Sequence, residues 1–188
     1  VGAHDRRASR GRGSLGNTHQ FSREGWGRRW TFAHSGQLKG GGRRPLGGFG
    51  PSGATDSGHA FCWMLGRLQA RFRALPRPET LDRAVADLAG ELHALGVFNM
   101  LLTDSRTLYA HCGKRLCYLT RRAPFGKATL IDEDWQVDFA QETTEHDVVT
   151  VIATQALTRD ECWTDLARGD VLTLRDGAVR LLRPVNLA

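Results

Sequence analysis

Hydrophobic residues recur with helical spacing in two segments of this 188-residue chain. The first segment follows Thr55, Asp56 and Ser57, any of which can cap a helix N-terminus. The second opens at Pro78 and is expected to end at Gly96. Their apolar faces consist of Ala60, Phe61, Met64, Leu65 and Leu68, and of Leu81, Val85, Leu88, Leu92 and Leu95. The sequence predicts two adjacent, antiparallel helices.

After Gly96 the apolar residues alternate with a period of two, which indicates strands. Turn residues at 104–106, 113–115 and 175–177 separate them. The expected strands are Val97–Thr103, Thr107–Cys112, Leu116–Arg121, Trp135–Phe139, Asp147–Thr154, Val171–Leu174 and Ala178–Leu182. Because the strand over 147–154 is rich in Val and Ile, it is expected to be central.

The part before the helices is rich in glycine and gives weaker signals. Residues 1–4 read as the end of a strand, residues 5–29 as an ordered loop, and Trp30–His34 as a short strand. Residues 39–53 contain nine glycines and prolines and predict a long loop. The whole pattern predicts one α+β domain over residues 1–188, with helices packed on antiparallel sheets.

The net charge of +6 is unevenly placed, since the first 50 residues hold ten Lys or Arg and only two acids. Such a basic segment can bind nucleic acid. Regular aromatic interleaving and any docking motif are absent, so solvated arginines, some of them contacting an anionic ligand, are the preferred interpretation. No run of 18 apolar residues exists, so no membrane-spanning helix is expected.

The four cysteines, Cys62, Cys112, Cys117 and Cys162, form no C-x-x-C pair, which disfavours a zinc site. Cys62 is expected to be a buried thiol in the first helix. Cys112 and Cys117 flank a turn and could form a disulfide across a hairpin, but free thiols in a cytoplasmic protein are the favoured interpretation.

The strongest candidate for chemistry is the segment Trp30–Leu38 followed by Ala54–Ser57. An apolar strand ends in Ser35 and Gly36, and Asp56 then stands where a helix begins. This arrangement can hold a small amino acid between backbone donors and a carboxylate. The plainer alternatives are a turn at the end of the strand for Ser35 and Gly36, and a helix cap for Asp56.

Seven stretches, in this order along the chain, resemble a class II glutamine amidotransferase domain of the Ntn-hydrolase superfamily, and within it the stand-alone bacterial YafJ-like group. The resemblance implies a four-layer αββα fold with two stacked antiparallel sheets. The stretches are Ala3–Arg6, Asn17–Phe21, Trp30–Leu38, Thr55–Ser57, Gly96–Leu102, Arg121–Gly126 and Asp147–Gln155.

The resemblance implies hydrolysis of the side-chain amide of glutamine, without a cofactor or a metal. In the family an N-terminal cysteine attacks the amide and releases ammonia, and water then clears the glutamyl thioester, with the α-amine of the cysteine as base. This chain begins with Val1 instead. The nucleophile is therefore expected in a preceding segment, and the 188 residues are expected to be the C-terminal three-quarters of the domain.

The resemblance also assigns substrate-binding residues. Arg6 matches the arginine that grips the α-carboxylate of glutamine, since a guanidinium presents two parallel donors. Asp56 matches the acid that receives the α-ammonium group. His19 matches a histidine that shapes the pocket wall. A surface arginine is the plainer alternative for Arg6.

His34, Ser35 and Gly36 match the family's His-Asn-Gly element, whose Asn amide and Gly N–H form the oxyanion hole. Here Ser35 replaces the Asn, and a hydroxyl is shorter and carries one proton. The backbone N–H of Gly36 is kept. We expect His34 to support the substrate pocket rather than to act as a general base.

Two functions remain open. The chain is part of a glutamine-hydrolysing enzyme that is active once joined to its nucleophile, or it is a non-catalytic remnant that at most binds glutamine or a related amino acid. The sequence names neither an acceptor for the ammonia nor a partner protein.

Overall fold

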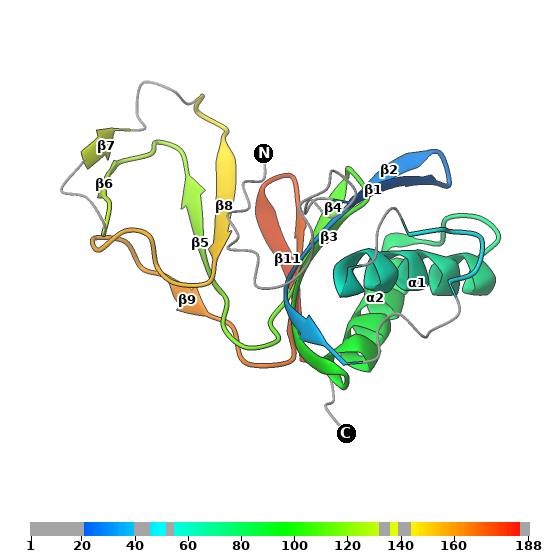
Figure 1. The fold of residues 1–188 in the computed structure, drawn as a ribbon. Coiled ribbons are helices and arrows are strands. Elements are labelled where there is room, and N and C mark those ends of the chain that lie inside the picture. The colour runs from blue at the N-terminus through cyan, green and yellow to red at the C-terminus, as the bar shows by residue number, and fades with distance from the viewer. Residues whose placement is uncertain (1–20, 40–45, 52–54, 132–135, 139–143, 185–188) are drawn as a thin grey trace.

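A six-stranded antiparallel sheet forms the centre of the molecule (Figure 1). The computed structural model describes residues 21–39, 46–51, 55–131, 136–138 and 144–184. The strand order in the central sheet is β1-β2-β3-β4-β10-β11. The strands are β1 (Phe21–Gly25), β2 (Arg28–Leu38), β3 (Gly96–Thr103), β4 (Thr107–His111), β10 (Asp170–Arg175) and β11 (Ala178–Pro184).

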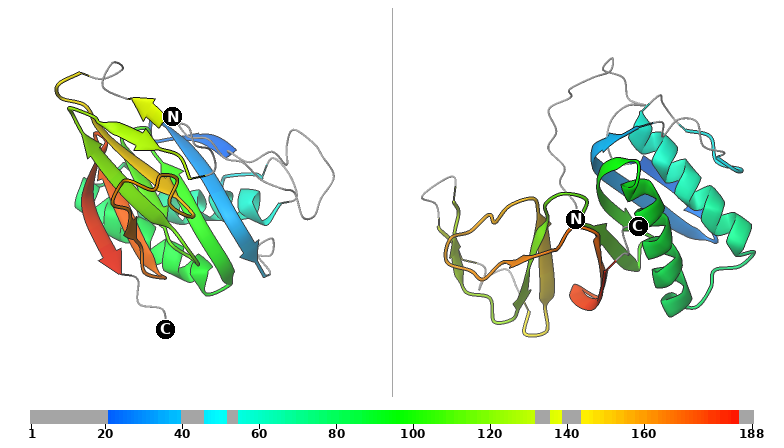
Figure 2. Two further views of the ribbon diagram at one scale, coloured as in Figure 1. Left: turned by 90° about the vertical axis from the view of Figure 1, so that its left-hand side faces the viewer. Right: turned by 90° about the horizontal axis from the view of Figure 1, so that it is seen from below.

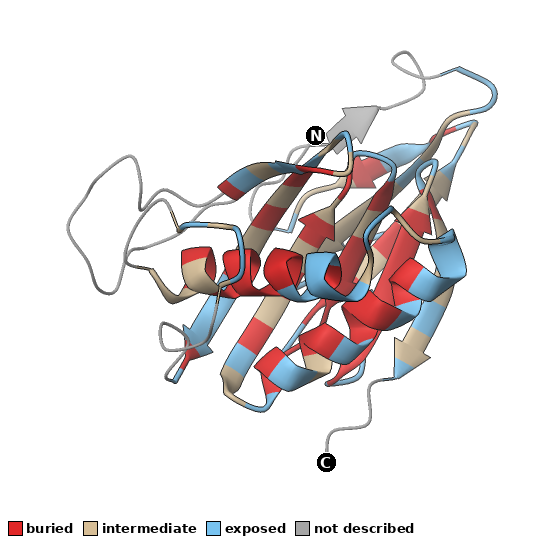
Figure 3. Cartoon of the chain, turned by 90° about the vertical axis from the view of Figure 1, so that its right-hand side faces the viewer, coloured by how far each residue is buried: buried red, intermediate tan, exposed pale blue. Residues whose placement is uncertain are grey.

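Both helices, α1 (Asp56–Arg71) and α2 (Pro78–His93), cover one face of this sheet (Figure 2, right). Their buried positions turn toward the strands, where Phe61 of α1 stacks on Phe32 of β2 at 5.2 Å between ring centroids (Figure 3). Ion pairs join Arg67 to Glu91 and Arg71 to Asp87. From the first pair to the second the residue number increases in α1 and decreases in α2, so the helices are antiparallel, as predicted.

A three-stranded sheet lies against the other face of the central sheet (Figure 1). Its order is β8-β5-β9, and its strands are β8 (Val148–Ala153), β5 (Cys117–Arg122) and β9 (Thr164–Asp165). A second apolar cluster packs in part of the space between the sheets, and it contains Ala110, Cys112, Leu116, Leu166, Leu172 and Leu174. The α+β class with stacked antiparallel sheets is confirmed. The described residues form three of the four expected layers.

The loop expected over residues 5–29 is wrong for its last part, where β1 pairs with β2 as a hairpin. Trp26 and Gly27 make the turn with positive φ angles of 52° and 68°, the conformation of tight hairpin turns. Phe21 faces Phe32 across the pair and both side chains are buried. The hairpin extends the expected short strand Trp30–His34 to the eleven residues of β2.

Two further predictions need correction. Gly96 is the first residue of β3, because α2 already ends at His93 with Ala94 as its C-cap. Within the described residues, β8 pairs only with β5, so it lies at an edge and not in the centre. The strand expected over Trp135–Phe139 is confirmed within the described residues as β7 (Gln136–Asp138), and it pairs with the unpredicted β6 (Lys127–Thr129).

All four cysteines are free, so the alternative of a disulfide between Cys112 and Cys117 is wrong. Among the helices of the described segments, none combines the length and the apolar character that crossing a membrane requires.

Candidate functional site

Asp56 ties the start of α1 to the end of β2. Its Oδ2 accepts a hydrogen bond from the Leu38 backbone N–H at 3.0 Å, and its Oδ1 accepts from the Ser57 N–H at 2.9 Å. The helix cap is Thr55, whose Oγ1 accepts from the Gly58 N–H at 3.1 Å. The Asp56 carboxylate is therefore not the cap. It is a half-buried negative charge at the positive end of α1, which stabilises it.

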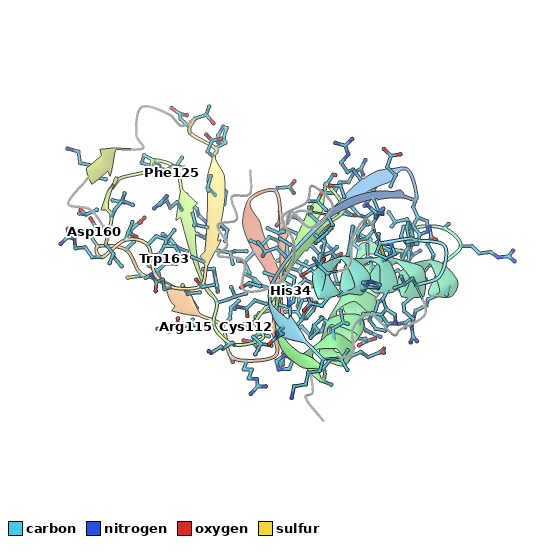
Figure 4. The ribbon with its side chains drawn as sticks, in the orientation of Figure 1. His34, Cys112, Arg115, Phe125, Asp160 and Trp163 are labelled. Atoms are coloured by element: carbon cyan, nitrogen blue, oxygen red, sulfur yellow. The ribbon has the colours of Figure 1, made fainter. Side chains whose placement is uncertain are left out.

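His34 lies on the opposite face of β2 from Ser35, between the sheet and α1 (Figure 4). Its side chain is buried, with Nδ1 2.9 Å from Ser57 Oγ and Nε2 3.3 Å from the carbonyl oxygen of Val97. Phe98 packs beside the ring, at 5.1 Å between centroids. The imidazole is thus held by groups of the protein itself, as a supporting role requires.

Ser35 is exposed and lines a cavity of about 420 Å³ between the two sheets. Strands β2 and β3 form one wall, and the end of β8 with the residues after it forms the other. The side chains are mostly apolar, and Ser35, Asn99 and Thr154 supply polar groups. The remaining lining residues are Ala33, His34, Met100, Leu101, Leu116, Ile152, Ala153 and Leu157.

Gly36 sits where only glycine fits. Its φ is +143°, and a Cβ at this position would lie 1.9 Å from the carbonyl oxygen of Val97. The partner strand repeats the feature, because Gly96 has φ +154° and its Cβ would lie 2.2 Å from the carbonyl oxygen of Gln37. The backbones of β2 and β3 therefore approach more closely here than a side chain would allow, and both glycines adopt a positive φ that other residues rarely adopt.

The three buried thiols of the described residues do not resemble an activated nucleophile. Burial raises the pKa of Cys62, Cys112 and Cys117 above the ordinary value. Reactive cysteines have a lowered pKa and are partly exposed, since the thiolate is the attacking form.

The structure brings four of the predicted site residues to one end of β2. Ser35 and Gly36 are on the strand, and the Asp56 carboxylate bonds the strand two residues further on. His34 is adjacent but points to the helix side. Arg6 and His19 lie outside the described residues.

Two further residues shape this region. The sequence pattern gave Asn99 no role and gave Ser57 only that of a possible helix cap. Asn99, opposite Ser35 on β3, accepts hydrogen bonds from the N–H groups of Gly113 and Lys114 and donates to the carbonyl of Arg115. Ser57 bonds His34. The signal for Asn99 was available, because it is the polar residue within an otherwise apolar strand from Gly96 to Leu102.

The fold agrees with a comparison against known families. A family model described as "Glutamine amidotransferases class-II" matches residues 1–187. This chain belongs to the class II glutamine amidotransferases.

Particular relatives place it in the YafJ-like group. It is 51% identical over 171 residues to a protein of Escherichia coli strain K12 named "Putative glutamine amidotransferase YafJ". The match covers 90% of this chain and 67% of YafJ. A protein of the same description from Haemophilus influenzae is 38% identical, with 93% and 60% covered. The chain thus spans about two thirds or less of the length of these relatives.

A solved structure supports the same assignment. It is the crystal structure of a "predicted glutamine amidotransferase" from Pseudomonas aeruginosa, with a TM-score of 0.79 and 46% identity. The likeness covers 88% of this chain and 65% of that one. A second structure, a class II domain protein from Silicibacter pomeroyi, shares the fold with a TM-score of 0.54 at 20% identity.

Proposed function

We propose that this chain forms the glutamine-binding side of an enzyme that hydrolyses the side-chain amide of glutamine to glutamate and ammonia. The observation that carries the proposal is the junction of β2 and α1. A carboxylate, Asp56, and a glycine whose conformation no other residue fits, Gly36, lie at the same strand end. Membership in the class II family supplies the substrate.

Each residue has one task in this proposal. Asp56 receives the α-ammonium group of glutamine, and Arg6 binds the α-carboxylate. The backbone N–H of Gly36 and the hydroxyl of Ser35 donate to the oxygen of the amide as negative charge develops on it. The attacking cysteine is supplied by a part of the protein beyond the 188 residues, in keeping with the greater length of the relatives.

Ser35 favours a second candidate function. A serine hydroxyl reaches less far than the amide of the asparagine that it replaces, and losing one oxyanion donor costs about 10²–10³ in rate. A chain with this weakened donor can still bind glutamine without turning it over. The second candidate is therefore a non-catalytic glutamine-binding protein.

The test is to join the chain at Val1 to the residues that precede the matching region in YafJ and to measure ammonia release from glutamine. We expect release that disappears when the nucleophilic cysteine is changed to serine. An Asp56→Asn variant should raise KM about tenfold or more, since it removes the charge that faces the ammonium group.

One outcome would contradict the proposed enzyme. Release no greater than that of the cysteine-to-serine control would exclude catalysis, and calorimetric binding of glutamine by that control would then support the binding protein.

The four free cysteines fit a reducing compartment, so we propose a cytoplasmic location. An acceptor for the ammonia is a further prediction that follows from the family alone.

A further inference from the structure

A hydrogen-bonded chain of buried side chains connects the start of α1 to the strand pair that holds Gly36. Ser57, the second residue of α1, lies with its Oγ 2.9 Å from Nδ1 of His34. The Nε2 of the same ring lies 3.3 Å from the carbonyl oxygen of Val97 on β3. Ser57 is 1% exposed and His34 is 2% exposed, so water does not compete for these bonds.

The chemistry of the partners fixes the direction of each bond. A carbonyl oxygen only accepts, so Nε2 of His34 carries the hydrogen and donates to Val97. In the neutral tautomer with the hydrogen on Nε2, Nδ1 is the acceptor. The Ser57 hydroxyl donates to it at 2.9 Å, which is shorter than the 3.4 Å from the same hydroxyl to Oδ1 of Asp56. Ser57 is also the residue whose N–H binds the Asp56 carboxylate. The chain therefore runs without a break from Asp56 to Val97.

The Val97 carbonyl at the far end is the group on which Gly36 rests. A Cβ on Gly36 would lie 1.9 Å from this oxygen and 3.1 Å from Nε2 of His34. The imidazole, the carbonyl and the Gly36 backbone are thus in direct contact. A shift of the Val97 peptide plane must move or rotate the Gly36 peptide, because no side chain fills the space between them.

We propose that His34 and Ser57 are positioning residues that hold the Gly36 peptide, and with it the N–H that faces the oxyanion, in register with Asp56. This inference rests on the proposed function, since it gives the Gly36 N–H its task. The physical gain is preorganisation: a donor fixed in advance costs no reorganisation when charge develops on the substrate. A displacement of about 1 Å can cost about 10² in rate.

A purely structural role predicts something else. Buried polar groups are normally hydrogen-bonded, so His34 and Ser57 could simply satisfy each other in the core. In that case their loss would lower stability alone and leave the kinetics of the folded enzyme unchanged. A measurement of kcat distinguishes the two explanations, because only a positioning role lowers kcat in the folded enzyme.

The experiment uses the chain joined to the YafJ start, with four variants. Ser57→Ala removes the first bond. His34→Asn places an amide where Nδ1 stood and loses the bond to Val97, whereas His34→Gln places an amide where Nε2 stood and keeps it. Tyr109→Phe is the matched control, because it removes a buried hydroxyl bond between α2 and β4.

We expect Ser57→Ala and His34→Asn to lower kcat about tenfold, because only the oxyanion donor is displaced. KM should stay within about twofold, since Asp56 is held by backbone N–H groups that these variants retain. His34→Gln keeps the bond to Val97 but loses the bond to Ser57, so its kcat should fall no further than that of Ser57→Ala. Tyr109→Phe should keep kcat within about threefold. Equal kcat values for all variants would overturn the proposal, as would a larger loss for Gln than for Asn.

A second measurement keeps the inference separate from the proposed function. The amide N–H resonance of Gly36 is recorded in the same proteins. It should move in Ser57→Ala and His34→Asn and stay in place in Tyr109→Phe. If the joined protein releases no ammonia, the proposed function fails, and this resonance alone decides whether His34 and Ser57 position Gly36. An unmoved resonance would overturn the inference.

Discussion

At the scale of single residues, Ser35 of β2 and Asn99 of β3 lie opposite each other but differ in their hydrogen bonds. The Asn99 amide is occupied by three backbone groups of the turn at 113–115. Among the residues that the structure describes, the Ser35 hydroxyl has no hydrogen-bond partner and faces the cavity. The family has an asparagine amide at the position of Ser35. Asn99 cannot supply an amide donor in its place without losing its hydrogen bonds to the turn at 113–115.

Restoring the longer donor at this position should raise the rate of the joined enzyme. In Ser35→Asn we expect kcat to increase about tenfold at nearly constant KM, since an oxyanion donor acts in the transition state. Ammonia release under saturating glutamine measures this. Ser35→Ala is the control and should lower kcat or leave it unchanged. A Ser35→Asn enzyme no faster than the parent would show that this side chain does not contact the oxyanion.

At the scale of elements, α2 is fastened to the sheet by a buried carboxylate. Asp82 is 4% exposed, and its Oδ1 accepts from the Tyr109 hydroxyl at 2.9 Å and from Nη2 of Arg175 at 2.6 Å. Arg175 also donates through Nε to Thr107. The cluster joins α2 to β4 and β10, so it fixes the helix against two strands of the central sheet.

Removing this carboxylate should cost far more than removing an exposed one from the same helix. Asp82→Ala leaves a partly buried guanidinium unpaired and should lower the free energy of unfolding by about 3 kcal/mol. Asp87→Ala is the matched control, because its ion pair with Arg71 is exposed and is worth about 1 kcal/mol at most. Urea denaturation of both variants tests the difference, and equal losses would contradict the proposed anchor.

At the scale of the whole molecule, a row of three basic side chains, of which the two histidines are buried, makes stability depend on pH. Nε of Arg168 donates to Nε2 of His93, whose Nδ1 lies 2.8 Å from Nε2 of His111. Burial, and then the neighbouring His93, lower the pKa of His111 from 6.5 to about 3. Burial and Arg168 also lower the pKa of His93. Both rings are therefore neutral in the folded protein at neutral pH.

Acid should destabilise the fold through this row. Between pH 6.5 and 3 the unfolded chain binds a proton at His111 that the folded chain excludes, so the free energy of unfolding falls as pH falls. The slope from this group is at most about 1.4 kcal/mol per pH unit. Urea denaturation from pH 7 to pH 4 measures it. His111→Gln should flatten the profile, and an unchanged slope in that variant would rule out this origin.

Local periodicity predicted much of the fold. The faces of α1 and α2 followed from apolar spacing, because a helix packed on a sheet must bury one continuous stripe. The strands β3, β4, β5, β10 and β11 followed from alternation and turn residues. The hairpin of β1 was missed because its middle residues, Ser22, Arg23 and Glu24, are polar and give no apolar alternation.

The sequence by itself determined the class of this protein and the residues at the strand end, Ser35, Gly36 and Asp56, because family motifs and local spacing are properties of neighbours along the chain. Only the tertiary structure decided that Asp56 binds Leu38 while Thr55 caps the helix, and that Ser57 reaches Val97 through His34. Apart from the local cap, those contacts join residues 18 to 63 positions apart. Distances of that kind are fixed by packing of the sheet against α1, which no local pattern encodes.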